Sequence, residues 1–275
     1  MKKRAFRVGI FDSGIGGLTV LAACAARVPY ARYYYYGDNA RAPYGGRSEE
    51  EILSFTREAC DFFLKHKVDA VVLACNTATA CALGEIRREY PFPVIGMEPA
   101  VKPAAECKKV LVLATERTAE SARMKMLLSR FPNCDFTLHA CLHLAGAIEK
   151  YYTEGEPFLL SAHLPEGNFD GVVLGCSHYS YFASEIAARY HAKVFDGGEG
   201  VAKRLEFVLN SLAAGNSAHP ISEQKANVCF SFRARKRIFF VGNSRELNKK
   251  VYFRTFVLDK TQKNKNFPKK VEKSG

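Results

Sequence analysis

The stretch VVLACNTA at residues 71–78 is repeated in pattern by VVLGCSHY at residues 172–179. In both, a run of aliphatic residues typical of a buried strand ends at a small residue, a cysteine and then polar residues. Each half of the chain therefore places one thiol at the carboxyl end of a strand. Because ligands bind at the carboxyl ends of parallel strands, we expect Cys75 and Cys176 to face one ligand from two sides.

Predicted strands and helices alternate along the chain on both sides of this repeat. Strands are expected at residues 7–11, 33–36, 68–74, 94–97, 109–114, 136–141, 170–175, 192–196, 227–232 and 237–241. Helices are expected at residues 18–26, 48–65, 77–89, 120–130, 144–151, 183–190, 200–214 and 245–256. Ser48 and Glu51 form the pattern of a capping box at the start of the second of these helices. The alternation predicts α/β architecture with parallel or mostly parallel sheets.

The order of elements starts afresh after Glu98-Pro99, which marks a candidate crossing between two domains. We expect a first α/β domain of residues 1–97 plus 209–258, a second of residues 98–208, and a flexible basic tail at residues 259–275.

Composition indicates a globular chain with no membrane span. Hydrophobic residues make up 48% of its 275 residues, yet no apolar run approaches the ~20 residues that a membrane helix needs. Residues 1–11 lack the core of a signal peptide. Nine cysteines at irregular spacing are typical of free thiols in a reducing compartment. We therefore expect a cytoplasmic location, and without CxxC or HExxH spacing a zinc site has no support.

The positive charge is concentrated near the C-terminus. Residues 233–275 carry +11 of the net charge of +12. A basic tail can bind nucleic acid by releasing counterions, but the part after Asp259 has no aromatic or helical pattern for reading bases. We expect a solvated tail, and nucleic-acid binding is the less favoured interpretation.

Both cysteines have chemistry suited to proton transfer, because a thiolate accepts a proton and a thiol returns it. The helices predicted after Cys75 and Cys176 would direct free N–H groups at each sulfur and lower the thiol pKa. The same N–H groups, with the side chains of Asn76, Thr77 and Ser177, would hold a substrate carboxylate. The alternative is that each cysteine is a small buried hydrophobic residue, which the duplication makes less favoured.

Two further polar residues lie at the same predicted strand ends. Asp12 ends the first strand, where it could assist Cys75 as a base, bind a substrate ammonium group, or simply cap the helix that follows. His178 lies two residues after Cys176 and could steer a proton near that thiol, or lie outside the site. Gly14, Gly16 and Gly17 fit neither a dinucleotide-binding nor a P-loop pattern. Their loop is better explained as a turn that lets the backbone approach a small anion.

Four blocks of sequence together carry a family resemblance over most of residues 7–258. They are GIFDSGIGG at residues 9–17, YGD at 36–38 with RAPYG at 41–45, ACNTA at 74–78, and GCSHY at 175–179. With these blocks in this order, the chain resembles the glutamate racemases of the aspartate/glutamate racemase family, enzymes that make D-glutamate for peptidoglycan without a cofactor.

The resemblance implies two pseudo-symmetric α/β domains with the active site in the cleft between them. It implies that Cys75 and Cys176 are the proton donor and acceptor on opposite faces of the α-carbon, with Asp12 and His178 assisting them. The residues implied to bind substrate or assist the thiols are Asp12, Ser13, Tyr44, Gly45, Asn76, Thr77, Ser177, His178, Thr115, Thr118 and Glu149. The family also implies glutamate as substrate, no metal or other cofactor, and a homodimer.

Several alternatives stay open at this point. A related racemase acting on aspartate or a hydantoin would use the same arrangement of two cysteines. A nucleic-acid-binding protein that uses the basic tail would show steep salt dependence lost on truncation after Asp259. A thiol–disulfide oxidoreductase would join Cys75 to Cys176 on mild oxidation, although these cysteines lack CxxC spacing. The residues do not indicate which cysteine removes the proton of the L-isomer.

Overall fold

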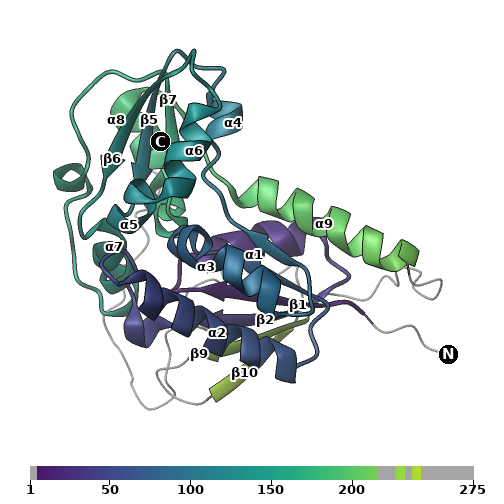
Figure 1. Cartoon of the computed structure of the whole chain (residues 1–275). Coiled ribbons are helices and arrows are strands. Elements are labelled where there is room, and N and C mark those ends of the chain that lie inside the picture. Colours follow the sequence, from purple (N-terminus) through teal and green to yellow (C-terminus); the bar gives the residue numbers. More distant parts are fainter. Residues whose placement is uncertain (1–4, 216–226, 233–236, 243–275) are drawn as a thin grey trace.

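The computed structural model describes residues 5–215, 227–232 and 237–242, with strands and helices arranged around two separate sheets (Figure 1). The strands are β1 (Arg7–Asp12), β2 (Arg32–Gly37), β3 (Ala70–Leu73), β4 (Val94–Gly96), β5 (Lys109–Ala114), β6 (Asp135–Ala140), β7 (Gly171–Gly175), β8 (Lys193–Phe195), β9 (Asn227–Phe232) and β10 (Arg237–Gly242). The α-helices are α1 (Gly17–Arg27), α2 (Glu49–Lys65), α3 (Asn76–Glu89), α4 (Val101–Ala104), α5 (Glu116–Glu120), α6 (Ala122–Ser129), α7 (Leu144–Thr153), α8 (Ala183–Tyr190) and α9 (Gly198–Gly215). The 3₁₀ helices are η1 (Asn39–Arg41), η2 (Leu160–His163) and η3 (Ser177–Phe182).

The two sheets repeat one strand order. The first runs β10-β9-β2-β1-β3-β4, with every pair parallel except β10 and β9, and the second runs β6-β5-β7-β8, all parallel. The segment β2-β1-β3-β4 therefore corresponds strand for strand to β6-β5-β7-β8. The prediction of two pseudo-symmetric α/β domains with mostly parallel sheets is confirmed. Strand β3, which precedes Cys75, holds the same place as β7, which precedes Cys176.

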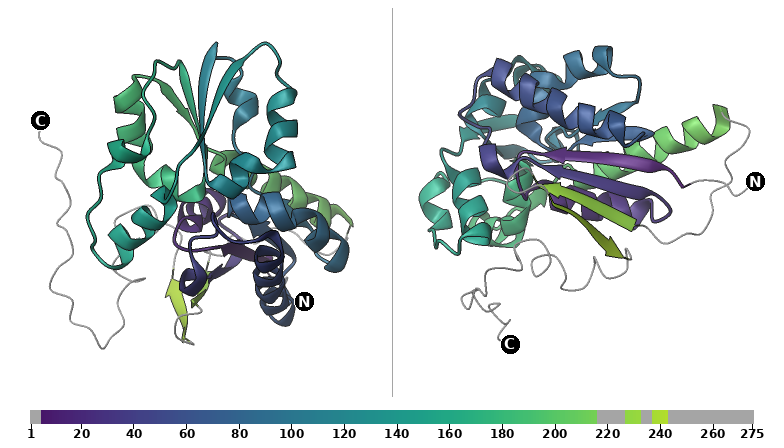
Figure 2. Two further views of the ribbon diagram at one scale, coloured as in Figure 1. Left: turned by 60° about the vertical axis from the view of Figure 1, so that its left-hand side comes forward. Right: turned by 90° about the horizontal axis from the view of Figure 1, so that it is seen from below.

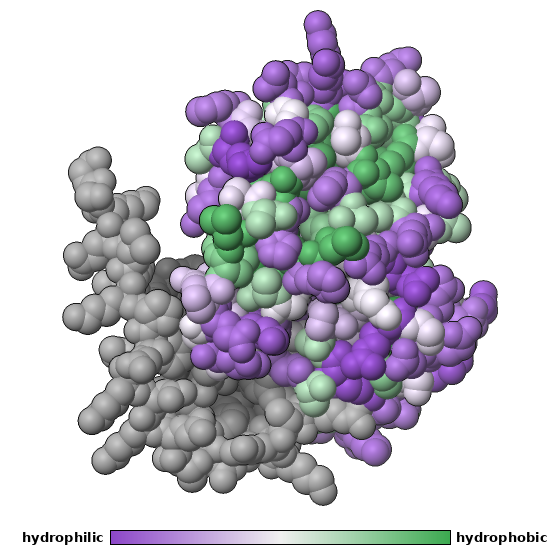
Figure 3. All heavy atoms as spheres, turned by 90° about the vertical axis from the view of Figure 1, so that its left-hand side faces the viewer, coloured by the Kyte–Doolittle hydropathy of each residue, from purple (hydrophilic) through white to green (hydrophobic). Residues whose placement is uncertain are grey.

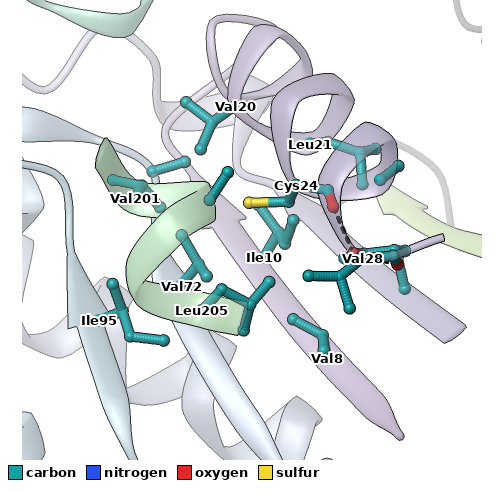
Figure 4. Close-up of a cluster of buried hydrophobic side chains, with 14 of the residues drawn as sticks. Val8, Ile10, Val20, Leu21, Cys24, Val28, Val72, Ile95, Val201 and Leu205 are labelled. Atoms are coloured by element: carbon teal, nitrogen blue, oxygen red, sulfur yellow. Dashed lines mark hydrogen bonds between the residues drawn. The ribbon is translucent and has the colours of Figure 1, made fainter. Parts of the chain in front are cut away.

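Helices cover both faces of each sheet (Figure 2). One face of the first sheet packs against α1 and α9 through the apolar cluster drawn in Figure 4. Its other face packs against α2 and α3. On the second sheet, α4 and α6 lie against one face and α7 and α8 against the other. These buried apolar layers fix the position of every strand end that faces the opposite sheet.

Helix α9 belongs to the first sheet by its contacts. Its residues Val201, Ala202, Leu205 and Leu209 are buried in the same cluster as the residues of α1. The predicted domain limit between residues 208 and 209 falls within this helix, which begins at Gly198. The domain limits as such stay a prediction.

Local signals located most elements, with two exceptions near the strand ends. The capping box of α2 is present, since Ser48 Oγ accepts from the Glu51 N–H while the Glu51 carboxylate accepts from the Ser48 N–H. Residues 115–118, where the sequence predicted neither a strand nor a helix, instead lie largely in the short helix α5, capped by Thr115. The segment directly after Cys176 is η3, a 3₁₀ helix, rather than the start of an α-helix. The predicted helix at 245–256 and the tail at 259–275 lie outside the described residues.

The surface is polar with some apolar areas. Figure 3 shows green, apolar residues gathered on the upper half of one face, which belongs to the second sheet and its helices. Leu138, Leu142 and Leu159 are exposed large hydrophobic residues of this half. Among the described residues, no helix combines the length and apolar character required to cross a bilayer.

Candidate active site

The two cysteines of the repeated motif lie at corresponding strand ends and are nearly inaccessible to solvent. Cys75 is 4% exposed and Cys176 is 6% exposed. Burial, with smaller contributions from negative charge on Asp12 and on Cys176, raises the pKa of the Cys75 thiol to about 12.

Cys75 is the N-cap of α3. Its sulfur accepts a hydrogen bond from the Ala78 N–H at 3.5 Å, and its thiol donates to Ser13 Oγ at 3.6 Å. Both contacts lower the thiol pKa, and the Ala78 N–H does so as the sequence predicted for a cysteine at a helix N-terminus, but burial outweighs them. The prediction that Cys75 has a lowered pKa is therefore wrong for this closed arrangement, because the thiol has lost its hydration.

Cys176 has a different partner, the imidazole of His178. The Cys176 Sγ lies 3.8 Å from His178 Nδ1, and His178 Nε2 lies 2.6 Å from Glu149 Oε2. Burial lowers the pKa of His178, but its contacts with Cys176 and Glu149 raise that pKa more, leaving it well above the ordinary value. A protonated His178 can donate from both ring nitrogens, to the sulfur on one side and to the carboxylate on the other.

Glu149 connects the two halves of the site. Its carboxylate in α7 accepts from His178, from the Ile15 N–H at 3.0 Å and from Asn39 Nδ2. Ile15 and Asn39 follow β1 and β2 of the first sheet, so Glu149 connects the loops after these two strands to His178, the neighbour of Cys176 in the other half. Gly14 is needed here, because a Cβ at this position would lie 2.3 Å from Glu149 Oε2.

Asp12 also bridges the two sheets, from beside Cys75. It is fully buried, its Oδ1 accepts from the Gly14 N–H at 2.9 Å, and its Oδ2 accepts from the Ser177 hydroxyl at 2.9 Å. Burial raises the pKa of Asp12 despite the opposing effects of His178 and these hydrogen bonds. A buried carboxyl with a raised pKa keeps its proton to higher pH than an ordinary aspartate does, which suits it to proton transfer.

Three threonine hydroxyls from both halves form a second polar group. Thr77 Oγ1 lies 2.9 Å from Thr115 Oγ1 and 3.2 Å from Thr118 Oγ1, and the latter two are 2.9 Å apart. All three residues are buried. Such a cluster can donate several hydrogen bonds to a carboxylate that enters between the sheets.

The loop after β2 lies against this threonine cluster. Gly45 accepts from the Arg117 N–H at 3.3 Å, and a Cβ on Gly45 would lie 3.2 Å from Thr115 Cβ. Tyr44 is buried and donates its hydroxyl to Asp38 Oδ2 at 2.6 Å. Gly45, one of the residues that the family resemblance implies for substrate binding, thus lies against Thr115 of the other half.

Asn76 uses its side chain differently from the expectation that it holds a carboxylate. Its Nδ2 donates to the Met97 carbonyl at 3.2 Å, where the chain leaves the first sheet. Its Oδ1 accepts no hydrogen bond from any residue that the structure describes. The side chain therefore ties the cysteine loop to the crossover segment, and one acceptor remains for another group.

Hydrogen bonds bring together the predicted residues at the strand ends, Asp12 with Ser177 and Thr77 with Thr115 and Thr118, and Glu149 reaches His178 from α7. Sequence reasoning did not assign a role to Asp38 and Asn39, which follow β2 directly. The register of β1 with β2, which pairs Asp12 with Gly37, places them on the same edge as Asp12. The signal that identified Asp12 was a polar residue directly after a predicted strand, and it missed Asp38 because the strand predicted at residues 33–36 extends to Gly37 in the structure. Among the described residues, no group of three His, Cys, Asp or Glu side chains could hold a metal ion.

Comparisons with known proteins agree with this geometry. A family model described as Asp/Glu/Hydantoin racemase matches residues 19–205. The chain is 42% identical over 228 residues to the glutamate racemase of Pseudomonas aeruginosa, covering 78% of this chain and 86% of that protein. It is 38% identical over 218 residues to the glutamate racemase of Halothermothrix orenii, covering 74% of this chain and 85% of that protein.

Two solved structures are similar in fold. Glutamate racemase isoform RacE1 of Bacillus anthracis matches with a TM-score of 0.70 and 29% identity, covering 84% of this chain and 89% of that one. Escherichia coli glutamate racemase, solved with L-glutamate and the activator UDP-MurNAc-ala, matches with a TM-score of 0.69 and 28% identity, covering 83% and 88%.

Proposed function

This chain belongs to the Asp/Glu/Hydantoin racemase family, and we propose that it interconverts L- and D-glutamate, with Cys75 and Cys176 as the two acid–base groups and no cofactor. The observation that carries the proposal is the placement of one thiol at each of two corresponding strand ends, which hydrogen bonds from Ser177 to Asp12 and from Ile15 to Glu149 hold together. A substrate α-carbon between them would present one face to each sulfur. Relatives named glutamate racemase support glutamate as the substrate.

Removing an α-proton without a cofactor is difficult, because the carbanion can delocalise only into its own carboxylate. The site must therefore supply fixed hydrogen-bond donors in a place from which water is excluded. The threonine hydroxyls of Thr77, Thr115 and Thr118 are buried and already grouped for this role. The Ser177 hydroxyl, now bound to Asp12, and the backbone N–H groups after each strand would add to them.

One sulfur takes the α-proton while the other delivers a proton to the opposite face. On the Cys176 side, His178 holds a proton next to the sulfur and Glu149 keeps the imidazole oriented. On the Cys75 side, the Asp12 carboxyl is the assisting acid–base group, and the thiol donates a hydrogen bond to Ser13 Oγ. The two thiols exchange roles when the reaction runs in reverse.

Substrate entry requires the two halves to separate. The contacts from Glu149 to Ile15 and from Ser177 to Asp12 cross directly between the halves, and both thiols are nearly buried. Domain opening would break these contacts, and closing around glutamate would exclude water and align both thiols.

The cellular part of the proposal is that the enzyme supplies D-glutamate for peptidoglycan synthesis in the cytoplasm and acts as a homodimer. Related enzymes acting on aspartate or a hydantoin are the second candidate, because the matching family model names all three substrate types. Light scattering of the purified chain tests the homodimer.

The enzymatic test uses L-glutamate, L-aspartate and a hydantoin as substrates, without added cofactor. For each, exchange of the α-proton is measured in deuterium oxide together with the loss of optical rotation. We expect exchange and racemisation of glutamate alone. Preference for one of the other substrates would assign the chain to the second candidate. The Cys75→Ala and Cys176→Ala variants should each abolish racemisation, and near-native turnover by either would contradict the two-thiol scheme.

A further inference from the structure

Tyr181 is a half-buried tyrosine of η3 that the reaction scheme does not use. Its hydroxyl donates to the Ile15 carbonyl at 2.8 Å, and the two residues are 166 positions apart in the sequence. Ile15 is 2% exposed and lies in the loop between β1 and α1. This hydrogen bond therefore joins the second half of the site to the loop that carries Gly14 and Gly16.

The second half binds the Ile15 backbone at both its N–H and its carbonyl. The N–H donates to Glu149 Oε2 at 3.0 Å, while the carbonyl accepts from Tyr181. Glu149 Oε2 also lies 2.6 Å from His178 Nε2. His178 and Tyr181 belong to the same 3₁₀ helix, whose period of about three residues per turn places positions i and i+3 on one face. This face of η3 thus reaches Ile15 twice, directly through Tyr181 and indirectly through Glu149.

The first half holds the same loop independently of Tyr181. The Ile15 carbonyl also accepts from the Leu18 N–H at 3.0 Å, in the first turn of α1. The Gly14 carbonyl accepts from the Tyr35 hydroxyl at 2.6 Å. A carbonyl oxygen has two lone pairs, so loss of the Tyr181 hydroxyl leaves the bond from Leu18 in place. Removing this hydroxyl should therefore release the loop from the second half without unfolding the loop itself.

The ring of Tyr181 has a separate role in packing. It lies against buried apolar clusters of both halves, the cluster of α1 and α9 in the first and the cluster of α7 and α8 in the second. Its centroid is 4.9 Å from the centroid of the Tyr152 ring, which packs against the same two clusters. A phenylalanine ring would keep these contacts, so Tyr181→Phe tests the hydroxyl alone.

We propose that Tyr181 is a positioning residue for the proposed racemisation, on which its effect on the reaction rests. Its hydroxyl holds the Ile15 backbone against Glu149, and so keeps that carboxylate oriented toward His178. Without the hydroxyl, the Ile15 N–H leaves the carboxylate more often, and Glu149 loses a fixed donor. Because His178 Nδ1 lies 3.8 Å from Cys176 Sγ, a change in the orientation of the imidazole slows proton transfer at that sulfur.

The direct readout is amide hydrogen exchange of the full chain, measured by mass spectrometry on overlapping peptides that cover residues 12–19. The Ile15 N–H exchanges only when it leaves Glu149, so its exchange rate reports how often the two halves separate at this loop. In Tyr181→Phe this rate should rise about fivefold, the effect expected for the loss of one hydrogen bond. Peptides of α2, on the opposite face of the first sheet from α1, should keep the wild-type rate.

Tyr190→Phe is the matched control. Tyr190 donates its hydroxyl to the Pro165 carbonyl at 2.7 Å, a hydrogen bond of the same kind that lies within the second half. Each variant therefore loses one bond from a tyrosine hydroxyl to a carbonyl, but only Tyr181→Phe should speed exchange of the loop. Unchanged exchange in Tyr181→Phe, or equally faster exchange in both variants, would overturn the proposal.

Glutamate turnover gives the second readout. In Tyr181→Phe, kcat should fall about fivefold while KM changes by less than about twofold, because the hydroxyl acts on the acid–base groups rather than on the substrate. Tyr190→Phe should keep both constants. A kcat in Tyr181→Phe at or above the wild-type value, or a rise in KM alone, would refute the positioning role. If the wild-type protein left L-glutamate unchanged while Tyr181→Phe still sped exchange at Ile15, the proposed reaction would fail and the role of Tyr181 in holding the loop against Glu149 would stand.

Discussion

Replacing Gly16 by Ala should separate the two halves of the site without unfolding either. A Cβ at residue 16 would lie 2.4 Å from Ser177 Oγ, 2.6 Å from His178 Nδ1 and 2.8 Å from the His178 backbone nitrogen. Ordinary van der Waals contact begins at 3.4 Å, so the Ser177 side must withdraw by about 1 Å. Because a backbone atom is among the three, side-chain rotation alone cannot relieve the clash. A misplacement of about 1 Å can cost ~100-fold in rate, and we expect that loss in kcat/KM for glutamate.

The assay is the initial rate of racemisation, with thermal unfolding measured on the same preparations. The matched control is Gly84→Ala in α3, where an added Cβ meets no atom within 4 Å. Gly84→Ala should keep wild-type activity and gain up to ~1 kcal/mol in stability, as expected for a helix interior. Near-native activity of Gly16→Ala, or an equal loss in Gly84→Ala, would refute the reasoning that close contact at Gly16 aligns the two halves.

Three further predictions concern the charges of the site and a helix cap. Glu149→Gln removes a contact that raises the pKa of His178, so the alkaline limb of kcat/KM, which needs the protonated ring, should move to lower pH; an unmoved limb would contradict the role of Glu149. Burial raises the pKa of Asp12 above its ordinary 3.8, so the folded state binds more protons at this carboxyl than the unfolded state does, and the wild type loses stability as the pH rises from 3.8 through the folded-state pKa. Asp12→Asn should therefore have a higher Tm than the wild type at pH 7 but not at pH 4, while losing activity. Equal Tm values for the two proteins at both pH values would count against a raised pKa. Ser48→Ala removes the N-cap of α2 and should cost about 1 kcal/mol, seen as a fall of roughly 2–4 °C in Tm, with activity kept.

What the sequence predicted well depends on local patterns. The aliphatic runs before Cys75 and Cys176 identified two buried strands and the thiols that follow them, because burial imposes its composition on short stretches. The capping box at Ser48 was predictable for the same reason, since both partners lie within one helical turn.

What the sequence could not supply comes from contacts between distant residues. The Ser177 hydroxyl binds Asp12 across 165 positions, and the Ile15 N–H binds Glu149 across 134. No hydrophobic periodicity in the sequence indicates which distant residues will be in contact. For the same reason the sequence predicted the wrong direction for the pKa shift of Cys75. The helix N-terminus is a local feature, whereas the burial that outweighs it comes from residues of the whole site.

The central claim, that two thiols act on opposite faces of one α-carbon, is tested most directly by the fate of the hydrogen. Pure L-glutamate is incubated with the enzyme in deuterium oxide, and at early conversion each isomer is separated and its deuterium content measured. If one sulfur removes the proton and the other delivers a different one, D-glutamate should be fully deuterated while the remaining L-glutamate stays protiated. D-glutamate that keeps the original hydrogen, or L-glutamate that gains deuterium as fast as D-glutamate forms, would show a single base at work and would contradict the account.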